Sequence, residues 1–277
     1  MSGWRRNWRW NETESKKYCE KCGKEIKYRD AGFNGIAIPL PCECIIAERE
    51  KEHTEQSKQG YAKTAEHWYT ASGIKKRYKN ILLDDITALR GQENAYDTAL
   101  TFFEEYKAEQ PLDGFGLVGG VGSGKTYITA ALVNQIVKYR LESMTDEEKK
   151  NAAKGQFKPV PVRFISFTEL FERLKPSNDE DSESLMQKVK NAKILVVDDL
   201  GACKITEWIT DRLFEIVDYR YCEELPIIYT TNILPNNLKA VVDKTISDRI
   251  DRITDRLKEM SKIEIVTAQS QRNPPAK

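Results

Sequence analysis

The chain has 277 residues, and its 44 lysines and arginines nearly balance 43 aspartates and glutamates. Such a chain is not a uniformly basic coat for nucleic acid, so any nucleic-acid contact must be a local patch. No apolar run is long enough to span a membrane, and the N-terminus lacks the apolar core of a signal peptide. We therefore expect a cytoplasmic protein without a membrane partner.

Three stretches differ in composition. Residues 1–46 hold three tryptophans and four of the six cysteines. Residues 47–72 are polar and helix-forming, which predicts a helical linker. Residues 73–277 alternate short apolar strands with helical patterns, which is typical of an α/β domain whose parallel sheet is covered on both faces.

The first stretch contains two close cysteine pairs. Cys19 and Cys22 are followed after nineteen residues by Cys42 and Cys44. Four thiolates can surround one tetrahedral zinc ion, and a reducing compartment favours metal over disulfides. Gly23 follows the first pair, where the turn needs a residue that tolerates positive φ. The second pair is Cys-x-Cys instead of the usual Cys-x-x-Cys, and four unligated thiols are the alternative.

The third stretch has a regular order of predicted elements. Helices are predicted by 3.6-residue apolar periodicity at 93–110, 127–137, 168–175, 185–191, 206–222 and 246–257. Buried strands are predicted at 114–118, 161–166, 193–198 and 226–231. The polar segment 142–158 predicts an exposed hairpin or a loosely ordered insertion, and the acidic, serine-rich segment 177–184 predicts a loop.

A complete P-loop follows the strand at 114–118 and precedes a helix. In this context the backbone N–H groups wrap a β-phosphate at the helix N-terminus. Lys125 neutralises phosphate oxygens and the Thr126 hydroxyl is a magnesium ligand. The sequence therefore predicts a P-loop NTPase that uses ATP and Mg²⁺. Its nucleotide-binding residues are Gly119, Gly120, Val121, Gly122, Ser123, Gly124, Lys125 and Thr126.

The strand at 193–198 ends in two carboxylates, in the form of a Walker B motif. Asp198 is expected to bind magnesium together with the P-loop, and Asp199 to polarise the attacking water. The alternative is that both aspartates cap the next turn. The following strand, 226–231, leads to Asn232, which can reach the γ-phosphate or can serve in a turn.

An arginine-rich helix is predicted near the C-terminus. Arg249, Arg252 and Arg256 recur at helical spacing and share one face, alternating with aspartates. One interpretation is a solvated, salt-bridged face. The other is that one arginine reaches the γ-phosphate bound by a neighbouring subunit, and the pattern alone does not choose between them.

The order of these motifs resembles the AAA+ ATPases, and more closely the helicase loaders of the DnaC/DnaI type. The segments that carry the resemblance are 72–80, 162–170, 194–201, 251–257 and 268–272. The resemblance implies an ATPase that assembles into an ATP-dependent homo-oligomer. It also implies that the protein deposits a hexameric replicative helicase on single-stranded DNA, with 1–46 as a zinc module that docks on the helicase.

The resemblance also assigns roles to single residues. Arg252 corresponds to the arginine finger that acts in trans, Arg256 to its neighbour at the same interface, and Asn232 to sensor I. Arg272 corresponds to sensor II. The chain departs from the family at Asp199, where many AAA+ enzymes have glutamate, which implies slow turnover, and at Ala268, where the family often has glycine.

Two other functions fit parts of the sequence. A transposase-helper ATPase has the same ATPase core, but the cysteine module argues against it. A zinc-based adaptor whose ATPase domain is a nucleotide switch with negligible turnover also fits.

Overall fold

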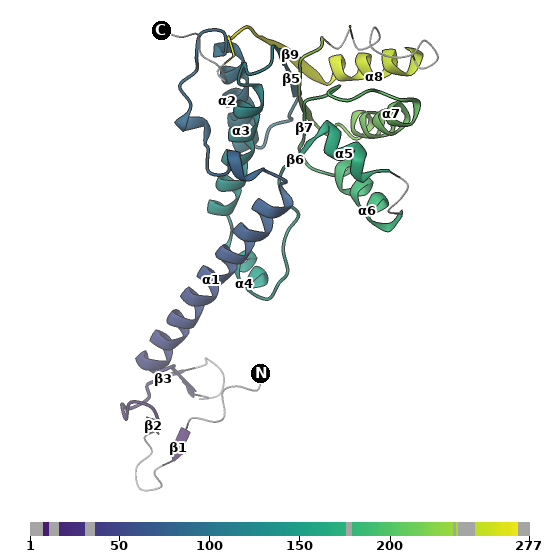
Figure 1. The fold of residues 1–277 in the computed structure, drawn as a ribbon. Helices are drawn as coiled ribbons and strands as arrows, with labels where there is room; N and C mark the ends of the chain where they lie inside the picture. Colours follow the sequence, from purple (N-terminus) through teal and green to yellow (C-terminus); the bar gives the residue numbers. More distant parts are fainter. Residues whose placement is uncertain are drawn as a thin grey trace. The chain divides into compact units, whose positions relative to one another are not determined.

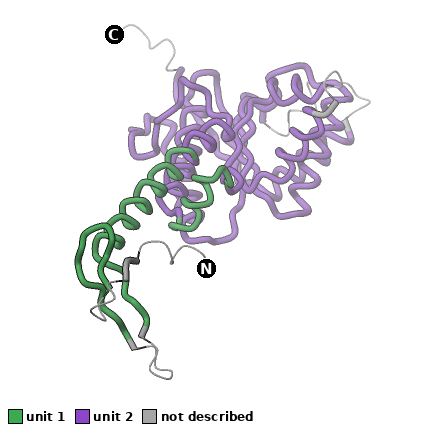
Figure 2. The backbone as a smooth tube through the Cα atoms, turned by 90° about the horizontal axis from the view of Figure 1, so that it is seen from below, with its two compact units in different colours: residues 1–63, 145–157 green, residues 64–144, 158–277 purple. Residues whose placement is uncertain are grey.

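The computed structural model describes residues 8–10, 17–30, 37–175, 179–234, 237 and 247–270. The chain divides into two compact units, residues 1–63 with 145–157 and residues 64–144 with 158–277 (Figure 2). Within the described ranges, no helix is both long and apolar enough to cross a membrane. The division into 1–46, 47–72 and 73–277 stays a proposal.

The larger unit is built on a five-stranded parallel sheet with the order β6-β7-β8-β5-β9. Its strands are β5 (Gly114–Gly119), β6 (Arg163–Ser166), β7 (Leu195–Asp198), β8 (Ile227–Thr231) and β9 (Ser261–Val266). The three central strands are almost wholly buried, which is why they read as continuous apolar runs in the sequence. Register pairs β5 with both β8 and β9.

Helices cover both faces of this sheet. Figure 1 shows α2 and α3 on one side and α5 to α8 on the other. The helices are α2 (Glu93–Lys107), α3 (Lys125–Glu142), α5 (Phe167–Arg173), α6 (Asp179–Lys190), α7 (Glu207–Cys222) and α8 (Ser247–Glu259). Two short 3₁₀ turns, η1 (Lys76–Tyr78) and η2 (Leu83–Asp85), precede α2. Ser166 caps α5 by accepting a hydrogen bond from the Glu169 N–H.

One buried cation links the helices to the sheet. Arg220 on α7 is fully buried, and its guanidinium donates to the carbonyl oxygens of Val189, Lys190, Ala192 and Pro226 at 2.7–3.0 Å. Val189 and Lys190 are the last two residues of α6, where helix carbonyls lack partners of their own, and Ala192 follows the helix. Arg220 therefore ends α6 and joins it to the start of β8.

Among its described residues, the smaller unit contains two short antiparallel strand pairs and two helices. β1 (Trp8–Trp10) pairs antiparallel with β2 (Lys17–Cys19), and β3 (Tyr28–Asp30) pairs antiparallel with β4 (Ala37–Pro39). Helix α1 runs over Glu43–Ala71, so its last turns belong to the larger unit. Helix α4 (Asp146–Ala153) contacts α1 so closely that a Cβ at Gly60 would lie 1.8 Å from the Lys149 carbonyl oxygen.

Three expectations about the elements were wrong. Segment 142–158 contains α4, because Thr145 and Glu148 form a capping box that starts a helix there. Segment 177–184 is helical from Asp179 onward; carboxylates favour a helix N-terminus, and Leu185 of the same helix is buried. Strand β9 (Ser261–Val266) was not predicted, because its residue types do not follow its burial: Glu264 is buried, whereas Ile265 is 51% exposed.

Candidate nucleotide site and cysteine cluster

The sheet order brings the predicted nucleotide motifs to one edge. β7, β8 and β5 are neighbours, and parallel strands end on the same side. The P-loop follows β5, Asp198 ends β7, and Asn232 follows β8. Ligands of open α/β sheets bind at this carboxyl edge. The connectivity thus assembles one site from segments more than a hundred residues apart, such as Lys125 and Asn232.

The Lys125 ammonium lies at the centre of this site. It is 4% exposed and donates to the carbonyl oxygens of Gly119 and Gly120, each at 2.8 Å. It also donates to Asn232 Oδ1 at 2.9 Å. The predicted sensor residue therefore contacts the predicted phosphate-binding lysine directly.

The first Walker B carboxylate is held by two hydroxyls. Asp198 Oδ1 accepts hydrogen bonds from Thr126 Oγ1 at 2.8 Å and from Thr230 Oγ1 at 2.7 Å. Burial raises the pKa of Asp198 above its ordinary value, and the two hydroxyl donors oppose that shift. A buried carboxylate next to a P-loop threonine is an oxygen pair of the kind that Mg²⁺ prefers.

Asp199 sits in an unusual backbone conformation. Its φ is 55°, in the left-handed region, and its N–H donates to Thr230 Oγ1 at 2.8 Å. Aspartate tolerates this region better than most residues, and such strain gathers at functional sites. The turn is fixed further by Leu200, whose N–H donates to the Thr230 carbonyl at 2.7 Å. Thr230 therefore holds the Asp198 carboxylate and the Asp199 backbone, a role that its place in a buried strand did not reveal.

A segment after β9 also reaches the P-loop. A Cβ at Gly122, whose φ is 81°, would lie 2.3 Å from Ser270 Oγ. Upstream, the Thr267 N–H donates to the Gly91 carbonyl at 3.0 Å. The proposed sensor II residue, Arg272, lies outside the described residues.

The arginines of α8 differ in their surroundings. Arg249 forms an ion pair with Asp211 on α7. Arg256 pairs with Asp218 at 2.6 Å, and its guanidinium lies 4.8 Å from the centre of the Phe214 ring. Arg252 is exposed and forms no ion pair with any residue that the structure describes.

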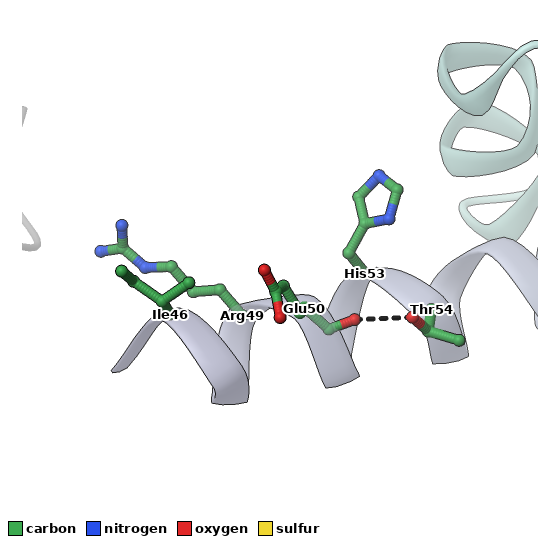
Figure 3. A pocket seen from close by; sticks show the side chains of 5 residues that line it. All are labelled: Ile46, Arg49, Glu50, His53 and Thr54. Atoms are coloured by element: carbon green, nitrogen blue, oxygen red, sulfur yellow. Dashed lines mark hydrogen bonds between the residues drawn. The ribbon is translucent and has the colours of Figure 1, made fainter. Parts of the chain in front are cut away.

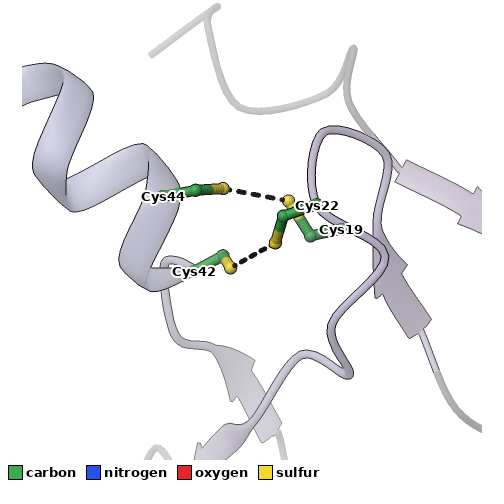
Figure 4. Close-up of side chains that lie close together, drawn as sticks. All are labelled: Cys19, Cys22, Cys42 and Cys44. Carbon is green, nitrogen blue, oxygen red and sulfur yellow. Dashed lines mark hydrogen bonds between the residues drawn. The ribbon is translucent and has the colours of Figure 1, made fainter.

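The four N-terminal cysteines come together in the smaller unit (Figure 4). Their sulfur atoms all lie within 4.8 Å of one another, with Cys19 3.5 Å from Cys44 and Cys22 3.3 Å from Cys42. Gly23 has φ 70°, so the first pair lies in the tight turn expected from the sequence. The second pair flanks Glu43, at the N-terminal end of α1.

The chemistry of the cluster fits a cation. Backbone N–H groups of Cys22 and Lys21 lower the pKa of Cys19 to about 7, whereas burial and neighbouring thiols raise that of Cys44 to about 12. Four thiolates this close repel one another unless a metal ion neutralises them. The set therefore fits tetrahedral zinc.

A shallow hollow lies along one face of α1 (Figure 3). It is lined by Ile46, Arg49, Glu50, His53 and Thr54. Thr54 turns its hydroxyl back to the Glu50 carbonyl at 2.7 Å. Among the described side chains, the potential metal-binding group contains the four cysteines and not His53.

Comparisons with known proteins agree with this geometry. Residues 151–274 match the family described as IstB-like ATP binding protein. The replicative helicase loader DnaI of Bacillus subtilis is 26% identical over 140 residues, which are 50% of this chain and 39% of DnaI. The phage-like element PBSX protein XkdC of Bacillus subtilis is 25% identical over 252 residues, 86% of this chain and 80% of XkdC. The match to DnaI thus covers less than half of that relative.

Solved structures show the same fold. A crystal structure of DnaI superposes with a TM-score of 0.55 and 25% identity, covering 70% of this chain and 95% of that one. A crystal structure of the DnaC helicase loader superposes with a TM-score of 0.52 and 24% identity, covering 70% of this chain and 100% of that one. The larger unit therefore has an AAA+ fold, residues 151–274 match the IstB-like ATP binding family, and the chain resembles the DnaI and DnaC helicase loaders.

Proposed function

We propose that this protein is an ATP-dependent loader that deposits a hexameric replicative helicase on single-stranded DNA. The observation that carries the proposal is how the three arginines of α8 are placed in a chain that is similar to DnaI. Arg249 and Arg256 are engaged by α7, whereas Arg252 is exposed between them. An exposed arginine on a helix fixed at both ends is suited to reach a nucleotide on a second copy of the chain.

The P-loop and the Walker B strand are proposed to bind ATP. The N–H groups of 121–126 would hold the phosphates, and Lys125 would exchange its carbonyl partners for phosphate oxygens. Thr126 and Asp198 would hold Mg²⁺, which offsets phosphate charge when bound.

Hydrolysis is proposed to depend on two side chains at the same edge. Asp199 would orient the attacking water, and Asn232, already bonded to Lys125, would contact the γ-phosphate as sensor I. Aspartate is one methylene shorter than the glutamate found in many AAA+ enzymes, so we expect slow turnover.

Two arginines are proposed to couple ATP to assembly. Arg252 would act in trans as the finger, with Arg256 at the same interface. Arg272 would act as sensor II. This is supported by Ser270, which lies two residues before Arg272 in the sequence and packs against Gly122 of the P-loop. Loss of the γ-phosphate would then weaken the contact between copies and release the helicase.

The N-terminal module is proposed to bind zinc through Cys19, Cys22, Cys42 and Cys44 and to dock on the helicase. A segment of this size cannot bury enough apolar surface to fold by itself, so the metal would stabilise it. Lys24 supports the arrangement, because it pairs at 2.7 Å with Glu43 at the start of α1.

Reconstitution tests the function. The purified chain is mixed with a hexameric replicative helicase from its own cell and with circular single-stranded DNA. We expect ATP-dependent oligomers, a complex with the helicase, and helicase bound to the DNA only when both the chain and ATP are present. A chain that remains monomeric with ATP, DNA and helicase would contradict the proposal.

A transposase-helper ATPase is the second candidate. It is favoured by the family match over 151–274, which does not include the cysteine cluster. Such a helper would load a transposase on duplex DNA and would not bind the helicase, so the same complex-formation assay separates the two. Steady-state ATPase rates with and without single-stranded DNA separate both from a nucleotide switch with negligible turnover.

A further inference from the structure

The side chain of Gln92 is buried beside the P-loop. It is 6% exposed and precedes the first residue of α2. Its Oε1 accepts a hydrogen bond from the Leu89 N–H at 3.0 Å, and its Nε2 donates to the Ser123 carbonyl at 2.8 Å. A backbone N–H can only donate and a carbonyl can only accept, so these partners fix which end of the amide faces the P-loop.

This contact sets the direction of one peptide group. The Ser123–Gly124 peptide is trans, as are all described peptides, so its C=O and N–H point in opposite directions. Because Gln92 holds the Ser123 oxygen on one side, the Gly124 N–H must point to the other. In a phosphate cradle the N–H groups face inward, and Gly124 reaches this orientation with φ 95° at the N-cap of α3.

The turn that carries Gln92 is itself held in place. The Gln92 N–H donates to the Leu89 carbonyl at 2.8 Å, and the Gly91 N–H donates to Glu93 Oε2 at 2.6 Å. A Cβ at Gly124 would lie 2.4 Å from Gln92 Nε2, so the amide packs directly on the glycine. Gln92 is therefore a fixed donor rather than a mobile surface amide.

We propose that Gln92 is a positioning residue for nucleotide binding. It holds the Ser123–Gly124 peptide so that the Gly124 N–H is directed at a bound phosphate. Without the donor, this peptide is free to rotate, and ordering it costs affinity when the nucleotide binds. The inference rests on the proposed binding of ATP by this P-loop.

Two substitutions in the full chain test the role. Gln92→Leu keeps the volume but removes both hydrogen bonds, and we expect about tenfold weaker binding of a fluorescent ATP analogue. Gln92→Glu keeps the acceptor for Leu89 but turns a carboxylate towards the Ser123 oxygen. At about pH 8 it should bind as weakly as the leucine variant, and near pH 6 a protonated carboxyl should donate and restore affinity to within about threefold of the unsubstituted chain.

Affinities are expressed relative to the unsubstituted chain at the same pH, which removes the titration of the nucleotide. A role in packing alone gives no recovery at acidic pH. If Gln92→Leu does not fold, the pH dependence of Gln92→Glu decides by itself.

Asn134→Leu is the matched control. Asn134 is a fully buried amide on α3 that bonds the carbonyls of Tyr78 and Ile81, away from the P-loop. It should lower stability without changing ATP affinity, and equal losses of affinity in both leucine variants would overturn the proposal. The proposal would also be overturned if Gln92→Leu bound the ATP analogue with unchanged affinity while Lys125→Ala lost binding. Unchanged affinity in Lys125→Ala would instead remove the proposed nucleotide site itself.

Discussion

The hydroxyl of Thr230 donates to Asp198 Oδ1 over 2.7 Å, from the neighbouring strand of the sheet. The Thr230 hydroxyl oxygen also accepts a hydrogen bond from the Asp199 N–H over 2.8 Å. One side chain thus joins the carboxylate proposed to hold magnesium to the backbone of Asp199, the residue proposed to orient water. Thr230 is fully buried, so water cannot replace it.

Thr230→Val should shift the pH dependence of ATP hydrolysis. Burial already raises the pKa of Asp198, and the Thr230 hydroxyl lowers it. Removing that donor raises the pKa further, so the carboxylate is lost at a higher pH as the solution is acidified. We expect the acid limb of the pH profile of kcat to shift to higher pH, and magnesium affinity to fall about tenfold. Thr230→Ser, which keeps the hydroxyl, should restore both; identical profiles for all three proteins would refute the role.

Lys125→Ala should abolish nucleotide binding. Lys125 is the buried ammonium between the P-loop carbonyls and Asn232, and no other lysine is placed there by the described contacts. Equilibrium binding of labelled ATP measures the effect. Affinity equal to that of the unsubstituted chain would rule out the site.

Arg252→Ala should leave ATP binding by the monomer nearly intact but remove turnover and assembly. The reason is that Arg252 is exposed on α8 and is proposed to act on the nucleotide of another copy. Sedimentation with ATP and steady-state hydrolysis are the measurements. Arg249→Ala is the control, because Arg249 pairs with Asp211 of its own chain and should cost at most about 1 kcal/mol of stability. Normal hydrolysis and assembly by Arg252→Ala would show that the finger is elsewhere.

The cysteine cluster should hold one zinc ion per chain. Metal analysis of freshly purified protein checks the stoichiometry, and a strong chelator should make the N-terminal residues sensitive to protease. Zinc should also be released as pH falls, since protons compete for the four thiolates. Cys22→Ser should lose the metal, whereas Cys222→Ser, which removes an exposed thiol outside the cluster, should keep it. A metal-free native protein would contradict the assignment.

Arg220→Met should destabilise the larger unit strongly. The change leaves four carbonyl acceptors without their donor, and losing several buried hydrogen bonds costs about 3 kcal/mol or more. Chemical denaturation measures the loss. Arg212→Ala, on the same helix but in an exposed pair with Glu215, should cost less than about 1 kcal/mol. Equal stabilities would mean that Arg220 does not hold α6 to β8.

The nucleotide motifs were accessible from sequence because each is local. The P-loop needs adjacent glycines, a lysine and a helix start, and Asp198 follows an apolar strand directly. Helix α4 and the start of α6 were missed for a different reason. Their polar composition suggested loops, while the capping box at Thr145 and buried packing of Leu185 decided for helix.

By itself, the sequence determined the α/β class, the phosphate-binding loop, the Walker B acids and the paired cysteines, because spacing along the chain specifies them. Tertiary structure alone decided that Asn232 bonds Lys125, that Thr230 bonds Asp198 and Gln92 bonds Ser123, and that Arg252 differs from its neighbours. Those relationships join residues on different strands and helices. Strand order and side-chain packing create these relationships, and neither produces a periodic pattern in the amino-acid sequence.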